Sequence, residues 1–456
     1  MNQPRHCPAV LIAAPASGQG KTTVTAALAR LHRNQGRKVR VFKCGPDFLD
    51  PMILERASGA PVYQLDMWMV GEQESRRLLW EAAGEADLIL IEGVMGLFDG
   101  SPSAADLARH FGVPVLAVVD ASAMAGTFGA LAYGLRHYRP GLPWAGVLAN
   151  RVGSARHADM LRDGLQDADD WMGALMRVQP GNAPLAAKAG AALLPERHLG
   201  LVAAHELDDS LQRLDAAADA LAATPLGEMS LEDLQSWAVD FPAPASTVAV
   251  PALLAGRTVA VGRDAAFCFT YAANVQCLEQ MGACVVFFSP LHDAVLPDCD
   301  AVWLPGGYPE LHTAKIAANT GMQASLRAHV AAGKPLWAEC GGMMALFESI
   351  TLADGSTATL WGLLLGHVTM QKRLAALGPQ QLAVAGHTLR GHTFHYSTSD
   401  SSAPVVARTA RPNEAVAPDA GEALYEQGSI LASYFHAWFP SSPDAVAHLL
   451  GGESKA

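Results

Sequence analysis

A glycine-rich segment near the N-terminus carries the residue types of a phosphate-binding loop. The apolar run 9–14 is followed by PASGQGKTT at 15–23 and then by a helical pattern. Glycines let a backbone close around a phosphate, a lysine adds a mobile positive charge, and a threonine hydroxyl can bind Mg²⁺. The proline at position 15 replaces the first glycine of the GxxxxGK[ST] pattern and leaves the loop shape open. The segment predicts an ATP site at Gly18, Gly20, Lys21, Thr22 and Thr23, with Thr22 also a ligand of Mg²⁺.

Four acidic residues follow two further apolar runs. Asp47 and Asp50 stand in KCGPDFLDP, and Glu92 and Asp99 stand in EGVMGLFDG. The carboxyl ends of parallel strands are where ligands collect, and Mg²⁺ prefers a few carboxylates together with phosphate oxygens and water. A single aspartate more often caps a turn or a helix. Four acids around one phosphate loop favour function, so we predict Asp47 and Glu92 near the metal, and Asp50 and Asp99 in substrate activation.

A second reactive centre is indicated by Cys340, which follows the apolar run PLWAE and precedes two glycines. This pattern predicts a strand-to-helix elbow that holds the thiol exposed and favours its thiolate. The amides of Gly307 and Gly341 are the predicted oxyanion donors, and His436 in SYFHAWF is the predicted base. A lone cysteine or histidine is more often structural. The double glycine, which weakens both strand and helix, argues for function here.

Two other histidines, His392 and His395, stand in RGHTFHY. On a strand, residues i and i+3 face opposite sides, so a shared metal site is not expected. We interpret both as structural or substrate-facing, with the role of general base as a weaker alternative.

Alternating strands and helices are needed to position these residues. Continuous apolar runs between helical patterns indicate parallel strands covered on both faces. The strands predicted in the first part are 9–14, 38–43, 87–92, 113–120 and 145–150, with helices at 22–34 and 75–83. The stretch 155–240 is helix-rich and offers no site. A second α/β series follows, with strands at 258–261, 284–289, 301–304 and 335–338.

The segment 242–256, PAPASTVAVPALLAG, has the composition of a linker. We therefore predict two doubly wound α/β domains, residues 1–241 with the phosphate loop and residues 257–456 with Cys340.

Bulk composition excludes several classes of protein. The 456 residues are 50% hydrophobic and 17% charged, enough for more than one core, and the net charge of −12 argues against a nucleic-acid partner. No apolar stretch reaches the roughly 18 residues of a membrane-spanning helix, and the first apolar run is a strand rather than a signal peptide. Seven cysteines without CxxC spacing indicate reduced thiols of a cytoplasmic enzyme.

Taken together, eight motifs resemble the cobyrinic acid or hydrogenobyrinic acid a,c-diamide synthases of cobalamin biosynthesis. They are GQGKTT, GPDFLDP, LDMWM, EGVMGLFDG, LPGGYPEL, ECGGMM, RGHTFHYS and YFHAWF, and they extend over nearly the whole chain. The resemblance implies that residues 1–241 form an ATP-binding, P-loop NTPase-like synthetase domain similar to dethiobiotin synthetase. It implies that residues 257–456 form a flavodoxin-like, class I glutamine amidotransferase domain. It further implies amidation of the a and c side-chain carboxylates of a corrin ring, with ATP, glutamine and Mg²⁺.

Carried over by position, Cys340 resembles the family's nucleophile and His436 the histidine that activates it. Lys21 and Thr22 resemble the nucleotide and Mg²⁺ residues, and Asn150 the residue that contacts adenine in related synthetases. The acids of the synthetase step are matched by Asp47, Glu92 and Asp99. Class I glutaminases usually carry a glutamate two residues after the histidine, where this chain has Trp438. The resembled family also lacks that glutamate, so what orients His436 is open.

The implied partners are small molecules: a corrin-type tetrapyrrole, glutamine and ATP. A homodimer is compatible with the sequence, whereas the order of the two amidations and the metal state of the substrate are open. One alternative is another tetrapyrrole, such as nickel-sirohydrochlorin. A different class is a P-loop switch ATPase with an inactive amidotransferase-like domain, against which the motifs around Cys340 and His436 argue.

Overall fold

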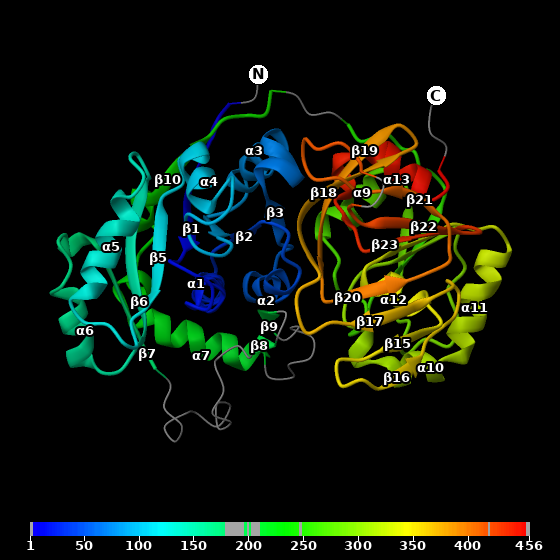
Figure 1. The fold of residues 1–456 in the computed structure, drawn as a ribbon. Helices are drawn as coiled ribbons and strands as arrows, with labels where there is room; N and C mark the ends of the chain where they lie inside the picture. The colour runs from blue at the N-terminus through cyan, green and yellow to red at the C-terminus, as the bar shows by residue number, and fades with distance from the viewer. Residues whose placement is uncertain are drawn as a thin grey trace. The chain divides into compact units, whose positions relative to one another are not determined.

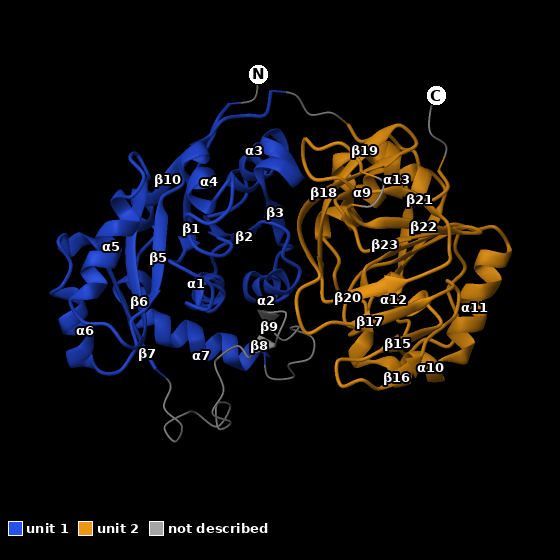
Figure 2. Ribbon diagram, in the orientation of Figure 1, with its two compact units in different colours: residues 1–247 blue, residues 248–456 orange. Residues whose placement is uncertain are grey.

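The computed structural model describes residues 3–177, 196–197, 200–201, 210–245, 249–417 and 420–452. The chain divides into two compact units, residues 1–247 and residues 248–456 (Figure 2). This division falls inside the proline- and alanine-rich segment 242–256. Each unit is an α/β body with its own central sheet (Figure 1).

Unit 1 is built on an eight-stranded sheet with the order β3-β2-β4-β1-β5-β6-β7, to which β10 adds beside β1. All pairs along this order are parallel, whereas β10 runs antiparallel to the first residues of β1. The strands are β1 (Arg5–Ala13), β2 (Val39–Cys44), β3 (Tyr63–Leu65), β4 (Leu88–Glu92), β5 (Val115–Asp120), β6 (Trp144–Val152), β7 (Trp171–Met176) and β10 (Ala238–Phe241). The central strands are buried almost throughout, as expected when helices cover both faces.

Helices α1, α2 and α7 share one hydrophobic core with a face of this sheet. The buried residues of α1 include Val24, Leu28 and Leu31, an i, i+4, i+7 stripe on one side of the helix. The helices of the unit are α1 (Lys21–Asn34), α2 (Leu49–Ser58), α3 (Glu72–Ala83), α4 (Ala104–Phe111), α5 (Thr127–His137), α6 (Ala155–Arg162), α7 (Ser210–Ala222) and α8 (Pro225–Glu228). Shorter elements are the π-helix η1 (Met67–Gly71), the 3₁₀ turns η2 (Ala168–Asp170) and η5 (Asp233–Trp237), and the two-residue strands β8 (Glu196–Arg197) and β9 (Gly200–Leu201).

Unit 2 has a seven-stranded sheet with the order β12-β11-β13-β14-β23-β22-β21. It is parallel from β12 to β23 and antiparallel at β22 and β21. The strands are β11 (Thr258–Gly262), β12 (Cys284–Phe288), β13 (Ala301–Leu304), β14 (Leu336–Glu339), β21 (Val405–Arg408), β22 (Ala423–Gln427) and β23 (Ile430–Ser433). Two hydrophobic clusters cover this sheet, one containing Ala338 and the other Trp337.

Two smaller sheets complete unit 2, with the orders β16-β15-β17-β20 and β18-β19-β24. Their strands are β15 (Ser349–Thr351), β16 (Thr357–Thr359), β17 (His367–Met370), β18 (Ala376–Val384), β19 (His387–His395), β20 (Ser397–Asp400) and β24 (His436–Ala437). The helices of the unit are α9 (Ala272–Gln280), α10 (Thr313–Ala318), α11 (Thr320–Ala331), α12 (Gly341–Leu346) and α13 (Pro443–Leu449), with 3₁₀ turns η6 (Pro309–Leu311) and η7 (Phe439–Ser441).

The sequence predicted two α/β bodies, each with a parallel sheet, and this fold is confirmed. Each of the nine predicted strands corresponds to a strand of one of the two main sheets, with ends shifted by a few residues. The two smaller sheets and six strands of the main sheets were not predicted; these strands are β3, β7, β10, β21, β22 and β23. Of these, β7 lies inside the stretch interpreted as helix-rich and β10 lies at its end. The reason is visible in β18, whose residues alternate between exposed and buried and form no continuous apolar run. Among the described residues, no helix is both long enough and apolar enough to cross a membrane.

Candidate active sites

The predicted phosphate loop joins the end of β1 to the start of α1. Gly18 and Gly20 have φ angles of 76° and 97°, a region that side-chain-bearing residues rarely adopt. A Cβ atom on Gly20 would also lie 2.2 Å from Asn150 Nδ2. The side-chain amide nitrogen Nδ2 of Asn150 donates a hydrogen bond to the carbonyl oxygen of Gln19 at 2.8 Å. The loop conformation therefore depends on glycine at position 20 and is tied to the carboxyl end of β6.

Lys21, the first residue of α1, lies between this loop and the loop after β4. Its Nζ donates to the carbonyl oxygens of Ala16 at 3.2 Å and Met95 at 2.7 Å. Burial lowers the pKa of Lys21, while the charges of nearby acids, Glu92 first, act in the opposite direction. In the described residues no carboxylate lies within ion-pair distance of Nζ. The ammonium group thus bonds only to neutral carbonyl oxygens in the described residues. An anionic phosphate would be a more favourable partner for it.

The acidic residues predicted from the strand ends meet around Lys43, on β2. Lys43 Nζ donates to Asp50 Oδ2 at 2.6 Å and to Glu92 Oε1 at 3.0 Å, and lies 3.6 Å from Asp47 Oδ2. Thr22 Oγ1 donates to the same Glu92 oxygen at 2.6 Å. The structure therefore brings Thr22, Asp47, Asp50 and Glu92 together beside the phosphate loop.

Lys43 is a residue of this site that the sequence analysis assigned no role. It is only 2% exposed, and it pairs in register with Glu92 on the neighbouring β4. Burial by itself lowers the pKa of Lys43, but the carboxylates of Asp50, Glu92 and Asp47 hold that pKa well above its ordinary value. A lysine inside the apolar strand VRVFKC was the available signal, because a buried ammonium group needs carboxylate partners.

Lys43→Met is expected to lower the free energy of unfolding by about 3–5 kcal/mol, since removing one partner of a buried ion pair leaves the other charges uncompensated. Urea denaturation of the full-length chain measures this. Arg162→Met is the control, because Arg162 pairs with Asp159 on the surface and should change stability little. Equal effects of the two substitutions would contradict a stabilising role of the Lys43 cluster.

The donors around Glu92 fit a magnesium ion. Glu92 is fully buried, and its Oε2 atom has no hydrogen-bond partner in the described part of the chain. Burial raises the pKa of Glu92 to about 7 even with Lys43 beside it, so a further cation would favour its ionised form. No group of three or more His, Cys, Asp or Glu side chains suited to a metal appears among the described residues. This donor set suits Mg²⁺, which takes few protein ligands and fills its shell with phosphate oxygens and water.

The remaining predicted residues of unit 1 shape the loops. Asp47 Oδ1 accepts the amide hydrogens of Leu49 and Asp50 at the start of α2, and burial raises the pKa of Asp47 to about 7. Burial alone would raise the pKa of Asp50, but Lys43 holds it below its usual range. Asp99 Oδ2 accepts the amide hydrogen of Gly96 at 2.8 Å. Thr23 lies partly exposed on the first turn of α1.

Cys340 occupies a sharp turn between β14 and α12. Its φ and ψ angles of 45° and −107° are strained for a residue with a side chain, and its amide donates to the carbonyl of Ser433 on β23 at 2.8 Å. A Cβ atom on Gly342 would lie 2.2 Å from the carbonyl oxygen of Leu304. A Cβ atom on Gly341 would lie 2.8 Å from the amide nitrogen of Gly307. The double glycine therefore lets the elbow pack against the loop after β13, where the second predicted oxyanion donor lies.

The prediction that Cys340 is exposed was wrong, because the residue is only 5% accessible and belongs to a hydrophobic core cluster. Burial raises the pKa of the Cys340 thiol, Glu310 raises it further, and the amide of Gly341 lowers it. The predicted strand-to-helix elbow is present, but Cys340 lies within the hydrophobic cluster around it, and this burial disfavours the thiolate. The thiol is therefore protonated at rest, and a base must remove its proton before it can act as a nucleophile.

His436, on β24, has the properties of such a base. It is 1% exposed, and burial lowers the pKa of His436 well below its usual value, so the imidazole is neutral and can accept a proton. Glycine at 306 makes room for the ring, since a Cβ atom there would lie 2.5 Å from His436 Cε1. Phe269 lies beside it, with ring centroids 6.1 Å apart.

The other two histidines have different surroundings. His392 pairs in register with His436, and their rings stack with centroids 4.9 Å apart. His395 stacks on Tyr434 at 3.8 Å and its Nε2 lies 3.1 Å from Glu422 Oε1. His392 thus packs directly against the predicted base, whereas His395 belongs to a separate cluster.

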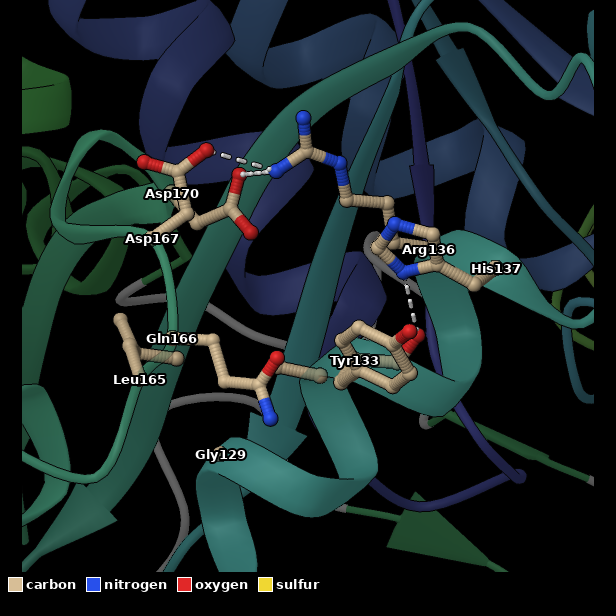
Figure 3. A pocket seen from close by; sticks show the side chains of 9 residues that line it. Gly129, Tyr133, Arg136, His137, Leu165, Gln166, Asp167 and Asp170 are labelled. Carbon is tan, nitrogen blue, oxygen red and sulfur yellow. Dashed lines mark hydrogen bonds and ion pairs between the residues drawn. The ribbon is translucent and has the colours of Figure 1, made fainter.

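A cavity of about 280 Å³ in unit 1 is lined by other residues (Figure 3). Arg136 crosses it from α5, where Nη1 donates to Asp167 at 2.9 Å and to Asp170 at 2.8 Å. Tyr133 and His137 stack on the same helix, with ring centroids 4.1 Å apart. None of the residues predicted to act in catalysis or binding lines this cavity.

Comparison with known proteins associates each unit with a family. Residues 10–180 match the CobQ/CobB/MinD/ParA nucleotide binding domain, and residues 258–444 match the CobB/CobQ-like glutamine amidotransferase domain. The chain is 59% identical over 446 residues to a hydrogenobyrinate a,c-diamide synthase of Stutzerimonas stutzeri, covering 98% of this chain and 99% of that protein. A hydrogenobyrinate a,c-diamide synthase of Pseudomonas aeruginosa is 58% identical, and the match covers 99% of this chain and 98% of that protein. A cobyrinate a,c-diamide synthase of Herminiimonas arsenicoxydans is 49% identical, and the match covers 98% of this chain and 97% of that protein.

Proposed function

This chain belongs to the family of hydrogenobyrinate and cobyrinate a,c-diamide synthases, and we propose that it converts the a and c side-chain carboxylates of a corrin-type tetrapyrrole into amides, using ATP and glutamine. The observation that carries this proposal is the presence of two separate reaction centres in one chain. Unit 1 combines the phosphate loop with the carboxylates around Lys43. Unit 2 combines a buried thiol with a neutral buried imidazole.

In unit 1 the chain's task is to make a carboxylate reactive. A carboxylate oxygen of the substrate attacks the γ-phosphorus of ATP, ADP leaves, and an acyl phosphate results. We assign the phosphates to Gly18, Gly20, Lys21, Thr22 and Thr23, and the adenine to Asn150. Asp50 and Asp99 are proposed to act in substrate activation. Ammonia then attacks the acyl carbon, and phosphate leaves with the bonding electrons.

Mg²⁺ is part of this proposal. Thr22, Glu92 and Asp47 would hold it, and when bound it would neutralise negative charge on the phosphate oxygens. The Oε2 atom of Glu92, which has no hydrogen-bond partner among the residues that the structure describes, supports this assignment.

In unit 2 the proposed task is to release ammonia from glutamine. His436 takes the thiol proton of Cys340, and the sulfur attacks the side-chain amide carbon of glutamine. The amides of Gly307 and Gly341 are proposed to stabilise the resulting oxyanion. The C–N bond breaks as the nitrogen takes up the proton, and water hydrolyses the thioester to glutamate.

Within the substrate class we propose hydrogenobyrinic acid, because both relatives near 60% identity bear that name, against 49% for the cobyrinate relative. Incubation with ATP, Mg²⁺ and glutamine, separately with hydrogenobyrinic acid, cobyrinic acid and nickel-sirohydrochlorin, tests this by mass spectrometry. We expect two successive replacements of OH by NH₂, fastest on hydrogenobyrinic acid. Faster turnover of another tetrapyrrole would contradict the substrate assignment. Absence of both amidation and glutamate release would instead favour a switch ATPase with an inactive second domain.

A further inference from the structure

His436 needs a partner that holds its ring in the right orientation. A general base must present a lone pair to the thiol, and in comparable sites a carboxylate beside the other ring nitrogen fixes that tautomer. The position two residues after His436 cannot supply one, because it is Trp438. Its side chain is 1% exposed and packs on Tyr271, with ring centroids 5.1 Å apart.

A carboxylate reaches the imidazole from a different element. Glu339, the last residue of β14, precedes Cys340 in the chain, and its Oε2 lies 4.0 Å from His436 Nδ1. Glu339 is 1% exposed. Of the basic side chains that the structure describes, only His436 comes within 4.0 Å of this carboxylate.

The second oxygen of Glu339 fixes the position of its carboxylate. Oε1 accepts a hydrogen bond from Trp337 Nε1 at 2.7 Å and one from the amide of Ala437 at 3.4 Å. Trp337 lies two residues earlier on the same strand and is fully buried. Ala437 is the neighbour of His436 on β24. The carboxylate is thus tied both to its own strand and to the backbone of the histidine that it faces.

The imidazole is confined on its other sides. Any side chain at position 306 would collide with it, and the ring of His392 stacks against it at 4.9 Å with an interplanar angle of 17°. With the ring held in this way, an ionised Glu339 next to Nδ1 favours the tautomer that carries its proton on Nδ1. Nε2 is then the nitrogen that can accept the thiol proton.

Proton transfer strengthens the contact. Burial raises the pKa of Glu339 to about 8 and lowers that of His436, so neither charge is favoured alone. When His436 takes the proton of Cys340, the imidazolium and an ionised Glu339 stabilise each other in a buried site. The pair therefore favours the state in which the thiolate forms over the resting state.

We propose that Glu339 is the positioning residue of the glutaminase centre and orients His436 from the strand that also carries the nucleophile. It takes the place of the glutamate that class I glutaminases usually carry two residues after the histidine. This inference rests on the proposed glutaminase activity of unit 2 and deepens it.

Glu339→Gln is the test, because the amide oxygen can still accept the bonds from Trp337 and Ala437 while the negative charge is lost. We expect kcat for glutamate release to fall by about 100-fold or more, as for a misdirected general base, while KM for glutamine stays nearly unchanged. Amidation supplied with ammonium salt and the melting temperature should remain close to wild type. Glu422→Gln is the matched control, since Glu422 is a carboxylate paired with a different histidine, His395, at 3.1 Å.

Each possible outcome supports or overturns the inference. A selective loss of kcat in E339Q supports the inference. Wild-type kcat in E339Q, or an equal loss in E422Q, overturns it. If E339Q does not fold, the same measurements are made on Glu339→Asp and Glu339→Asn. Glu339→Asp keeps the negative charge and should therefore retain more glutaminase activity than Glu339→Asn. Equal activities of these two variants overturn the inference. A wild-type protein that releases no glutamate refutes the proposed function itself, so the two failures are distinguishable.

Discussion

Cys340→Ala is expected to abolish amidation with glutamine and to leave amidation with a high concentration of ammonium salt. The thiol is the only group that forms the thioester in the proposed scheme, so its removal stops glutamate release altogether. The ATP-dependent activation of the carboxylate takes place in unit 1 and does not need the thiol. Glutamate release, ATP consumption and product mass are measured with each nitrogen source.

The control for this substitution is Cys299→Ala. Cys299 is also buried, burial raises the pKa of its thiol to about 11, and its sulfur lies 3.8 Å from His329 Nδ1. It lies outside the strand-to-helix elbow, and we expect its loss to leave both activities in place. A folded Cys340→Ala protein that amidates with neither nitrogen source would contradict the division of labour between two centres.

Lys21→Ala is expected to reduce amidation by about 100-fold or more with either nitrogen source, since removal of one preorganised donor to developing charge typically has this effect. Its ammonium group now bonds to the carbonyls of Ala16 and Met95 and is available to the phosphates of ATP. Steady-state amidation with glutamine and with ammonium salt measures the loss. Glutaminase activity should persist, because the thiol and its base lie in the other unit.

Lys38→Ala provides the comparison for this second experiment. Lys38 is exposed and stands at the opposite end of β2 from the acidic cluster, so its loss should leave turnover nearly unchanged. Unimpaired amidation by Lys21→Ala would show that the phosphate loop does not take part in the reaction. ATP binding measured by isothermal titration separates weaker binding from slower chemistry.

Much of the first site could be predicted because its chemistry is local in the chain. The loop at 15–23 contains its own glycines, lysine and threonine, and the adjacent strand and helix follow from continuous hydrophobic patterns. The acids at strand ends were predictable by a general rule, since parallel strands end at one edge of the sheet. Lys43 was missed because its role depends on Glu92, a residue of the neighbouring strand, and that pairing is not visible along the chain.

The second site shows where local pattern is insufficient. The double glycine after Cys340 correctly indicated an elbow, since only a close backbone approach requires it there. The exposure of the thiol was predicted wrongly, because burial depends on what packs over the elbow. In this protein the surrounding hydrophobic core buries Cys340 and raises the pKa of its thiol.

The amino-acid sequence by itself determined the two α/β units and the phosphate loop, and it supplied the residues that we propose as nucleophile and base. Each of these depends on residues that are neighbours in the chain and whose hydrophobic period or backbone freedom is a local property. The tertiary structure alone decided the ionisation of the thiol, the burial of Lys43 and the approach of Glu339 to His436. Those properties depend on desolvation and on the distance between charges, and both quantities exist only once strands far apart in sequence are side by side.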